Sequence, residues 1–151
     1  MLLFVAWLLS LLVGLEKMSA VICGLIFIFN SARLAGWHTK GIWQKPLLWS
    51  LYLALWLINL GFLSSTTQLF FAIPPSWILH LFTIGGIGLI TLGMMSRVSL
   101  GHTGRNIHAP PTLASWFFAL VIVSLVFRFF LPLLDAKHYL WWLNLAGICW
   151  C

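Results

Sequence analysis

The sequence predicts an all-α fold, a polytopic membrane helix bundle of about six transmembrane helices, organised as one domain over residues 1–151. Composition is the first observation behind this prediction: 62% of the residues are hydrophobic and only 7% are charged, whereas soluble domains average about 45–50% apolar and about 25% charged residues. The second is that the apolar residues form long runs without the alternation of a membrane β-strand. These properties exclude a soluble enzyme, a disordered chain and a nucleic-acid-binding domain.

Each predicted helix is an apolar run near the length of about 20 residues that crosses the hydrocarbon core. The six runs, of which the first and last are short, are Leu2–Leu15, Ser19–Ala35, Leu47–Ser64, Ser76–Ser96, Thr112–Leu131 and His138–Cys151. Proline pairs precede the fourth and fifth runs, where a missing N–H costs little because the first turn of a helix lacks intrahelical acceptors. The first run lacks the basic segment and cleavage site of a signal peptide, so we expect a helix of the bundle or the remnant of one.

The basic residues indicate the orientation of the bundle. The chain has eight Lys and Arg residues against only two acids, Glu16 and Asp135. The segments Arg33–Lys45 and Arg97–Pro111, which lie on the same side of a six-helix bundle, together carry five of the basic residues. Because cytoplasmic loops of membrane proteins are enriched in Lys and Arg, we expect these segments and both chain termini to be cytoplasmic.

His80 is the first candidate for chemistry, because it lies about one turn inside a predicted span. An ionisable side chain within a span is costly and usually faces the bundle interior or a cavity. Neutral imidazole is also the commonest side-chain ligand of metals, haem iron and copper included. The alternative is an interfacial histidine that hydrogen-bonds a carbonyl group. Arg128, near the far end of the fifth span, is interpreted as a side chain that snorkels to the interface.

The helix after His80 is unusually rich in glycine, so much of its surface lacks side chains. The glycines are Gly85, Gly86, Gly88 and Gly93. Small residues let neighbouring helices approach closely, and we expect this role here. The alternative is that these glycines clear space for a flat macrocycle.

A compact polar loop follows this helix and carries the second candidate histidine. Gly101 can cap the helix in the left-handed conformation, which would hold His102 and Arg105 on a short turn. This turn can face an anion, a haem propionate or lipid headgroups, and the alternative is a positively charged membrane anchor. His80 and Arg97 are 17 positions apart, which is about 25 Å along a helix. On a continuous helix, His80 and His102 therefore cannot bind one metal.

Few other residues can carry chemistry. With only two acids in the chain, carboxylate proton relays are almost excluded, so we expect any chemistry to come from a cofactor. Cys149 and Cys151 form a C-x-C pair that can bind a soft metal, or they are chance residues at the end of a truncated last helix. His38, His108 and His138 are interpreted as interfacial residues.

The stretch Met95–Arg105, with His80 about one helix-length upstream, resembles the signature of the NnrS family of bacterial membrane proteins. Arg33–Trp37, followed by Pro46–Trp49, is similar to the family's loop and next span, and the order of the motifs agrees from about Asn30 to Leu134. The resemblance implies a multi-pass protein of the bacterial inner membrane that associates with haem and copper. It also implies a role in the response to nitric oxide and nitrosative stress, often alongside denitrification.

Carried over to this sequence, the resemblance implies candidate haem or metal ligands at His80 and His102, and loop anchors or propionate partners at Arg97 and Arg105. It covers only the C-terminal half of a family member, because the W-H-x-H-E-M-type motif of the N-terminal half is missing here. We therefore expect a fragment or one part of a split protein. Its partners besides the lipid bilayer would be a separate N-terminal half or a second copy of the chain. The alternatives are a non-catalytic scaffold that complements such a half and a permease for a small neutral molecule.

Overall fold

In the computed structural model, which describes residues 2–71, 73–106, 110–134 and 136–150, every regular element is a helix. The α-helices are α1 (Leu2–Leu12), α2 (Glu16–Trp37), α3 (Pro46–Thr67), α4 (Pro75–His80), α5 (Leu89–His102), α6 (Thr112–Leu125), α7 (Leu131–Leu134) and α8 (Tyr139–Trp150). Two π-helical segments join α4 to α5 and α6 to α7; they are η2 (Leu81–Gly88) and η3 (Val126–Phe130). Two short 3₁₀ turns are η1 (Lys40–Ile42) and η4 (Ala136–His138). The predicted all-α fold is confirmed.

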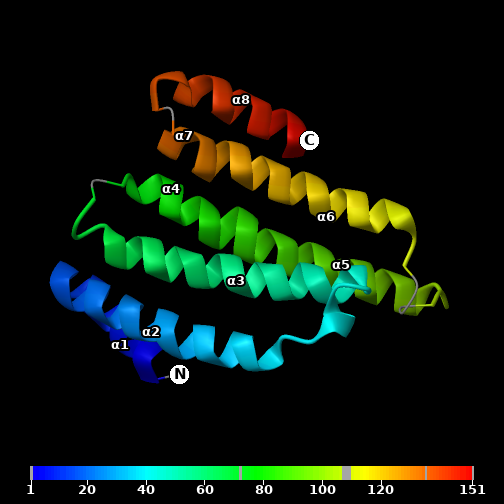
Figure 1. Cartoon of the computed structure of the whole chain (residues 1–151), viewed down its shortest axis with the longest axis horizontal. Helices are drawn as coiled ribbons and strands as arrows, with labels where there is room; N and C mark the ends of the chain where they lie inside the picture. The colour runs from blue at the N-terminus through cyan, green and yellow to red at the C-terminus, as the bar shows by residue number, and fades with distance from the viewer. Residues whose placement is uncertain (1, 72, 107–109, 135, 151) are drawn as a thin grey trace.

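If α4, η2 and α5 are taken as one run, and α6, η3 and α7 as another, successive helices run in opposite directions and pack side by side (Figure 1). Helix α1 packs on α2, α2 on α3, and α3 on the continuous run of α4, η2 and α5. Helix α6 packs on η2 and α5, and α8 covers α6 on its outer side. Short connections favour this serial arrangement, because they leave each helix beside the one before it.

Four helical stretches are long and apolar enough to cross a bilayer, and they correspond to the second to fifth predicted runs. They are Glu16–Trp37, Pro46–Thr67, Pro75–His102 and Thr112–Phe130. The two runs that were short in the sequence form shorter apolar helices, at Leu2–Leu12 and Tyr139–Cys149. Many large apolar side chains are exposed on the outside of the bundle, which suits a protein whose solvent is lipid.

The long helices begin where the sequence favours a first turn. Pro46 and Pro75 stand at the start of their helices, where the absent N–H is not needed. Glu16 places a negative charge in the first turn of α2, next to the positive end of the helix dipole. The apolar run predicted a start at Ser19, but the helix begins about one turn earlier, at Glu16. The charged residues before the apolar run are also good helix formers.

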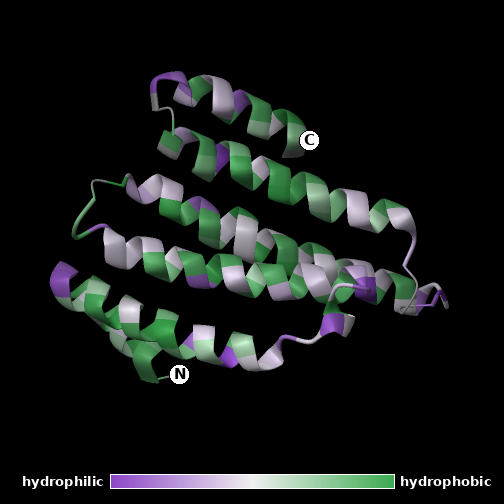
Figure 2. Cartoon of the chain, in the orientation of Figure 1, coloured by the Kyte–Doolittle hydropathy of each residue, from purple (hydrophilic) through white to green (hydrophobic). Residues whose placement is uncertain are grey.

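The bundle has two chemically different ends. Figure 1 shows the last residues of α2 and α5 and the first residues of α3 and α6 at the same end, which we call the basic end. The starts of α2, α4 and α8 lie at the other end, which we call the distal end. Hydrophilic residues gather toward the ends, while most of the helical surface is apolar (Figure 2). The shared side expected for the two basic segments is confirmed, and its cytoplasmic location stays a prediction.

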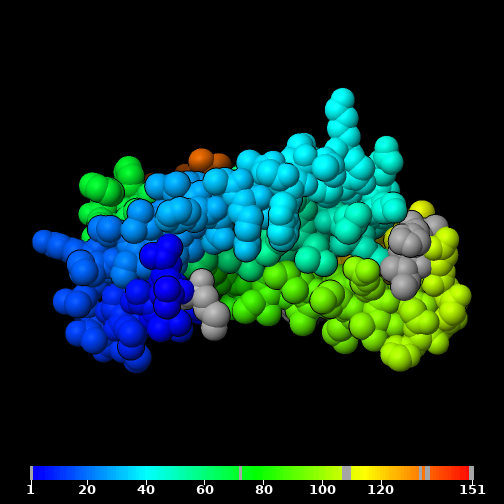
Figure 3. All heavy atoms as spheres, turned by 90° about the horizontal axis from the view of Figure 1, so that it is seen from below, coloured from blue at the N-terminus to red at the C-terminus, as the bar shows by residue number. Residues whose placement is uncertain are grey.

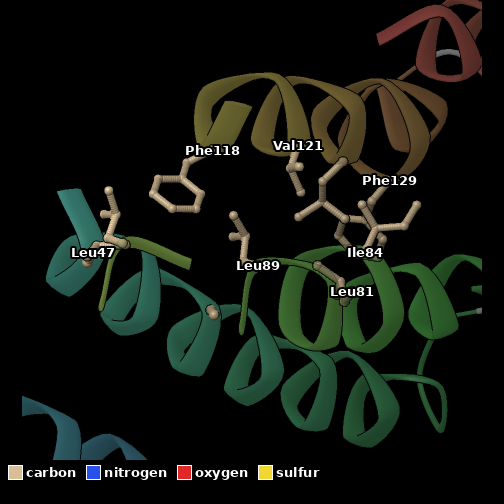
Figure 4. Close-up of a cluster of buried hydrophobic side chains, with 10 residues drawn as sticks. Leu47, Leu81, Ile84, Leu89, Phe118, Val121 and Phe129 are labelled. Atoms are coloured by element: carbon tan, nitrogen blue, oxygen red, sulfur yellow. The ribbon is translucent and has the colours of Figure 1, made fainter. Parts of the chain in front are cut away.

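The main core lies between α3, the run from α4 to α5, and α6 with η3. Leu81, Leu89 and Phe118 are fully buried in it. In Figure 4, Leu89 of α5 points toward Phe118 and Val121 of α6, and Ile84 of η2 lies on the side of Phe129. Lipid tails are as apolar as leucine, so close packing rather than burial from water holds these helices together.

A second cluster joins α1, α2 and α3 through Cys23, Ile26 and Phe62. Next to it, Asn59 is only 1% exposed, and its Nδ2 donates a hydrogen bond of 2.8 Å to Oγ of Ser31, which links α3 to α2. In Figure 3, which views the α1–α2 side, the dark blue atoms of α1 lie at one end of this face and the green atoms of α5 at the other. Helix α1 therefore covers only part of the face.

Candidate functional site

His80 is the last residue of α4 and is half-buried at the distal end. Pro75 fixes the start of the helix five positions earlier, so the imidazole lies about 7–8 Å along the helix axis from that start. The next eight residues form the π-helical segment η2. Segments of π-helix are rare and are frequent at functional sites, because the wider turn repositions the flanking side chains.

Arg128 is the neighbour that the sequence did not reveal. It lies in η3, the second π-helical segment, and η3 packs against α4. Its charge is close enough to act on the imidazole of His80. Two ionisable residues thus lie on elements that pack together, His80 next to one π-helical segment and Arg128 within the other. The sequence does carry a signal for this pair, since both residues interrupt apolar runs near the distal ends of antiparallel helices.

The other three candidate residues lie at the basic end. Arg97 and His102 are on α5, Arg105 follows it, and all three side chains are exposed. The helix from Pro75 to His102 is continuous, and His80 and His102 are 22 positions apart in it, which is about 33 Å. The structure therefore brings three of the four candidates to one end and places His80 at the other, so the two histidines cannot share a metal.

The turn after α5 has the geometry of a Schellman motif, but not at the expected glycine. The sequence predicted that Gly101 caps the helix, whereas the helix continues to His102 and Gly104 takes the left-handed conformation, with φ +66°. The N–H of Arg105 donates to the carbonyl of Leu100 at 3.0 Å, and the N–H of Gly104 donates to that of Gly101 at 3.3 Å. These bonds satisfy the last carbonyls of α5 and fix the direction in which the chain leaves it.

Replacing Gly104 by alanine is expected to destabilise the protein by about 1 kcal/mol, because a Cβ atom makes the left-handed conformation unfavourable. The measurement is the free energy of unfolding in mixed detergent and dodecyl sulfate micelles. Gly41→Ala is the matched control, since it lies in a turn of the other basic-end loop with open space around its Cα and no positive φ. Equal effects of the two substitutions would contradict the role of Gly104.

Gly85 and Gly86 of the fourth span serve close packing, as expected, and leave no room for a macrocycle at their own positions. A Cβ atom on Gly85 would lie 2.9 Å from Cδ2 of Leu125, and one on Gly86 would lie 2.3 Å from Cγ1 of Ile58. Gly88 differs, because it lines a groove of about 370 Å³ between α5, α6 and α8, which Cys149 also lines. Cys151, the other half of the C-x-C pair, lies outside the described residues, as do His108 and Asp135.

The described residues provide single candidate ligands rather than a closed metal site. No group of three or more His, Cys, Asp or Glu side chains that could hold a metal ion occurs in the part of the chain that the structure describes. A groove of about 560 Å³ lies between α1, α2, α3 and η2, and aromatic residues such as Trp7, Phe29 and Phe82 line it. None of the four candidate residues lines this groove or the groove beside Gly88. The described residues therefore show single candidate ligands but no closed site for a haem or a copper ion.

His38 at the basic end is better positioned than the sequence indicated. Its Nδ1 is hydrogen-bonded to the hydroxyl of Tyr52 at 3.3 Å, and its ring contacts those of Trp43 and Tyr52. Tyr52 is buried, whereas His38 itself is exposed. Such an anchored imidazole presents its other nitrogen in a defined direction, which is a common property of metal-binding histidines.

Comparison with known proteins adds the family. The family described as NnrS protein matches residues 1–151, which is more of the chain than the stretch from Asn30 to Leu134 that carries the motifs. No curated protein and no solved structure matches the chain. The match spans the four long apolar helices, both candidate histidines and the basic-end loops. The chain therefore belongs to the NnrS family.

Proposed function

We propose that this chain is a haem- and copper-associated protein of the bacterial inner membrane that acts in the response to nitric oxide and nitrosative stress. Membership of the NnrS family supports the role. The observation that carries the proposal is the position of His80, a half-buried imidazole inside an apolar helix, followed directly by a π-helical segment. An ionisable residue held at this depth is costly without a function.

His80 is the residue that would hold a haem in this half. Its surroundings suit the apolar macrocycle, because large apolar side chains such as Leu79 of α4 and Val126 of η3 are exposed on these helices. Haem iron held by His80 would supply the binding of small ligands, and the protein around it would control their access and the polarity of the site. This chain contributes the imidazole, the packed helices that fix its position, and the positive charge of Arg128 beside it.

His102 would form a separate site at the basic end. Copper accepts imidazole ligands, and an exposed histidine on an ordered turn is open to the metal from the aqueous side. Arg97 and Arg105 lie at the same end. They can therefore anchor the loop among lipid headgroups or bind the propionates of a group held at His102, but they are too far from His80 to serve a haem there.

A second candidate function is a half-protein that completes its cofactor site with another chain. The single-histidine arrangement at His80 favours it, since the described residues supply a ligand from one side only. A separate N-terminal half or a second copy of this chain would then provide the remaining ligand. In this case the chain alone folds but binds little cofactor.

The test is an optical spectrum of the detergent-purified chain, oxidised and reduced with dithionite, with iron and copper measured in the same sample. We expect a Soret band that sharpens on reduction and near-stoichiometric iron, and we expect the double variant His80→Ala, His102→Ala to lose both metals. A double variant with the full metal content of the wild type would contradict the proposal. A folded but colourless wild-type chain that gains haem only with its partner half would favour the second candidate.

A further inference from the structure

Two buried hydrogen-bond donors without an acceptor lie on two packed elements at the distal end. Nε of Arg128 and Nε1 of Trp142 are both buried, and neither has a hydrogen-bond partner in the described part of the chain. Arg128 belongs to η3 and Trp142 to α8, and these two elements pack against each other. Phe127, next to Arg128 in sequence, stacks on Trp142 with ring centroids 6.3 Å apart and ring planes 7° apart.

This arrangement calls for an acceptor that the described residues do not supply. Buried polar groups are nearly always hydrogen-bonded, so two unpaired donors on packed elements need an explanation. Free snorkelling does not explain Arg128, because the side chain is half-buried and its Nε is covered. An oxyanion has several lone pairs, can accept from a guanidinium and an indole together, and neutralises the positive charge.

The depth of the site indicates where the oxyanion comes from. Arg128 lies two positions before Phe130, where the fourth long apolar stretch ends, which is about 3 Å along the helix. Beside it, the rings of Trp77 and Tyr139 stack with centroids 5.9 Å apart and join the start of α4 to the start of α8. Tryptophan and tyrosine gather at the level of lipid headgroups. Basic pockets between membrane helices at this level bind anionic headgroups.

We propose that Arg128 and Trp142 bind the phosphate of an anionic phospholipid at the distal end of the bundle. The lipid acts as a structural ligand that bridges η3 and α8. This site is independent of haem, because its two principal residues are not candidate cofactor ligands.

The experiment is native mass spectrometry of the detergent-solubilised full chain, titrated separately with phosphatidylglycerol, phosphatidylcholine and inorganic phosphate. Arg128→Gln and Trp142→Phe are expected to weaken phosphatidylglycerol binding, by about tenfold or more for the arginine, since it removes a charge-assisted hydrogen bond. Arg33→Gln removes the same charge at the basic end and is the control for Arg128. Trp141→Phe is the control for Trp142, because Trp141 is the adjacent indole and is 70% exposed. Both controls are expected to bind as the wild type does.

The three titrations separate the sources of the oxyanion. Tight binding of phosphatidylglycerol over phosphatidylcholine and inorganic phosphate, lost in both test variants, supports the proposal. If inorganic phosphate binds as tightly as phosphatidylglycerol, the site binds a soluble anion rather than a lipid, and the proposal is overturned. Unchanged phosphatidylglycerol binding in Trp142→Phe and Arg128→Gln would also overturn it.

Discussion

Replacing Gly86 by alanine is expected to destabilise the bundle by about 1–3 kcal/mol, the usual cost of overpacking a well-packed interior. The reason is geometric: the new Cβ atom would lie 2.3 Å from Cγ1 and 2.9 Å from Cδ1 of Ile58, so α3 and η2 would have to separate or Ile58 would have to change rotamer. Gly86 is buried where η2 crosses α3. The measurement is the free energy of unfolding in mixed micelles, followed by circular dichroism.

Gly36→Ala is the matched control for this substitution. Gly36 is also a helical glycine, but a Cβ atom there meets nothing within 4 Å, so alanine should stabilise α2 by up to about 1 kcal/mol through helix propensity. Shortening the obstructing side chain with Ile58→Ala should recover part of the loss in the Gly86→Ala background. If the changes in the free energy of unfolding caused by Gly86→Ala and Ile58→Ala simply add in the double variant, the two residues are not in contact.

His80→Ala and His102→Ala are expected to have independent effects on bound cofactor. The two residues are 22 positions apart on one continuous helix, about 33 Å. His80→Ala should reduce haem absorbance per protein by about tenfold or more, because it removes the ligand itself. His102→Ala should leave the haem spectrum unchanged and reduce only copper. The measurement is the reduced-minus-oxidised spectrum with iron and copper content for each single variant.

His80→Gln separates loss of a ligand from loss of structure, because glutamine keeps the polarity and much of the volume of histidine. It should lose haem as His80→Ala does while the helical content stays that of the wild type. A His102→Ala variant that loses the haem spectrum together with copper would contradict two separate sites.

The helices could be predicted from the sequence because each depends on a local apolar run. The run Leu47–Ser64 lies inside α3, and Ser76–Ser96 lies inside the stretch from Pro75 to His102. The ends were less predictable: hydropathy falls at Arg97, but no residue from Arg97 to Leu100 breaks a helix, so α5 continues until Gly104 supplies the left-handed turn. A change in hydropathy marks the edge of the apolar layer, whereas backbone chemistry marks the end of the helix.

The arrangement around His80 could be predicted only in part. From the sequence, His80 is identified as a candidate because an ionisable side chain inside an apolar run costs free energy. Arg128, in contrast, is interpreted from the sequence as a separate side chain at the interface. The pair becomes visible only when α4 and η3 are known to pack together. The two π-helical segments were also not predictable, since one extra residue per turn leaves the composition of an apolar helix unchanged. The proposed roles of the four candidate residues stay predictions.

The helix from Pro75 to His102 is longer than the membrane is thick. Its 28 residues measure about 42 Å, against about 30 Å for the hydrocarbon layer. Tilting can absorb part of this mismatch, and the rest projects into water. Arg97 marks the level at which the helix leaves the hydrocarbon, and His102 lies about 7–8 Å beyond it. A reagent or metal donor confined to the aqueous compartment at the basic end would therefore reach His102 without crossing the membrane, and would not reach His80.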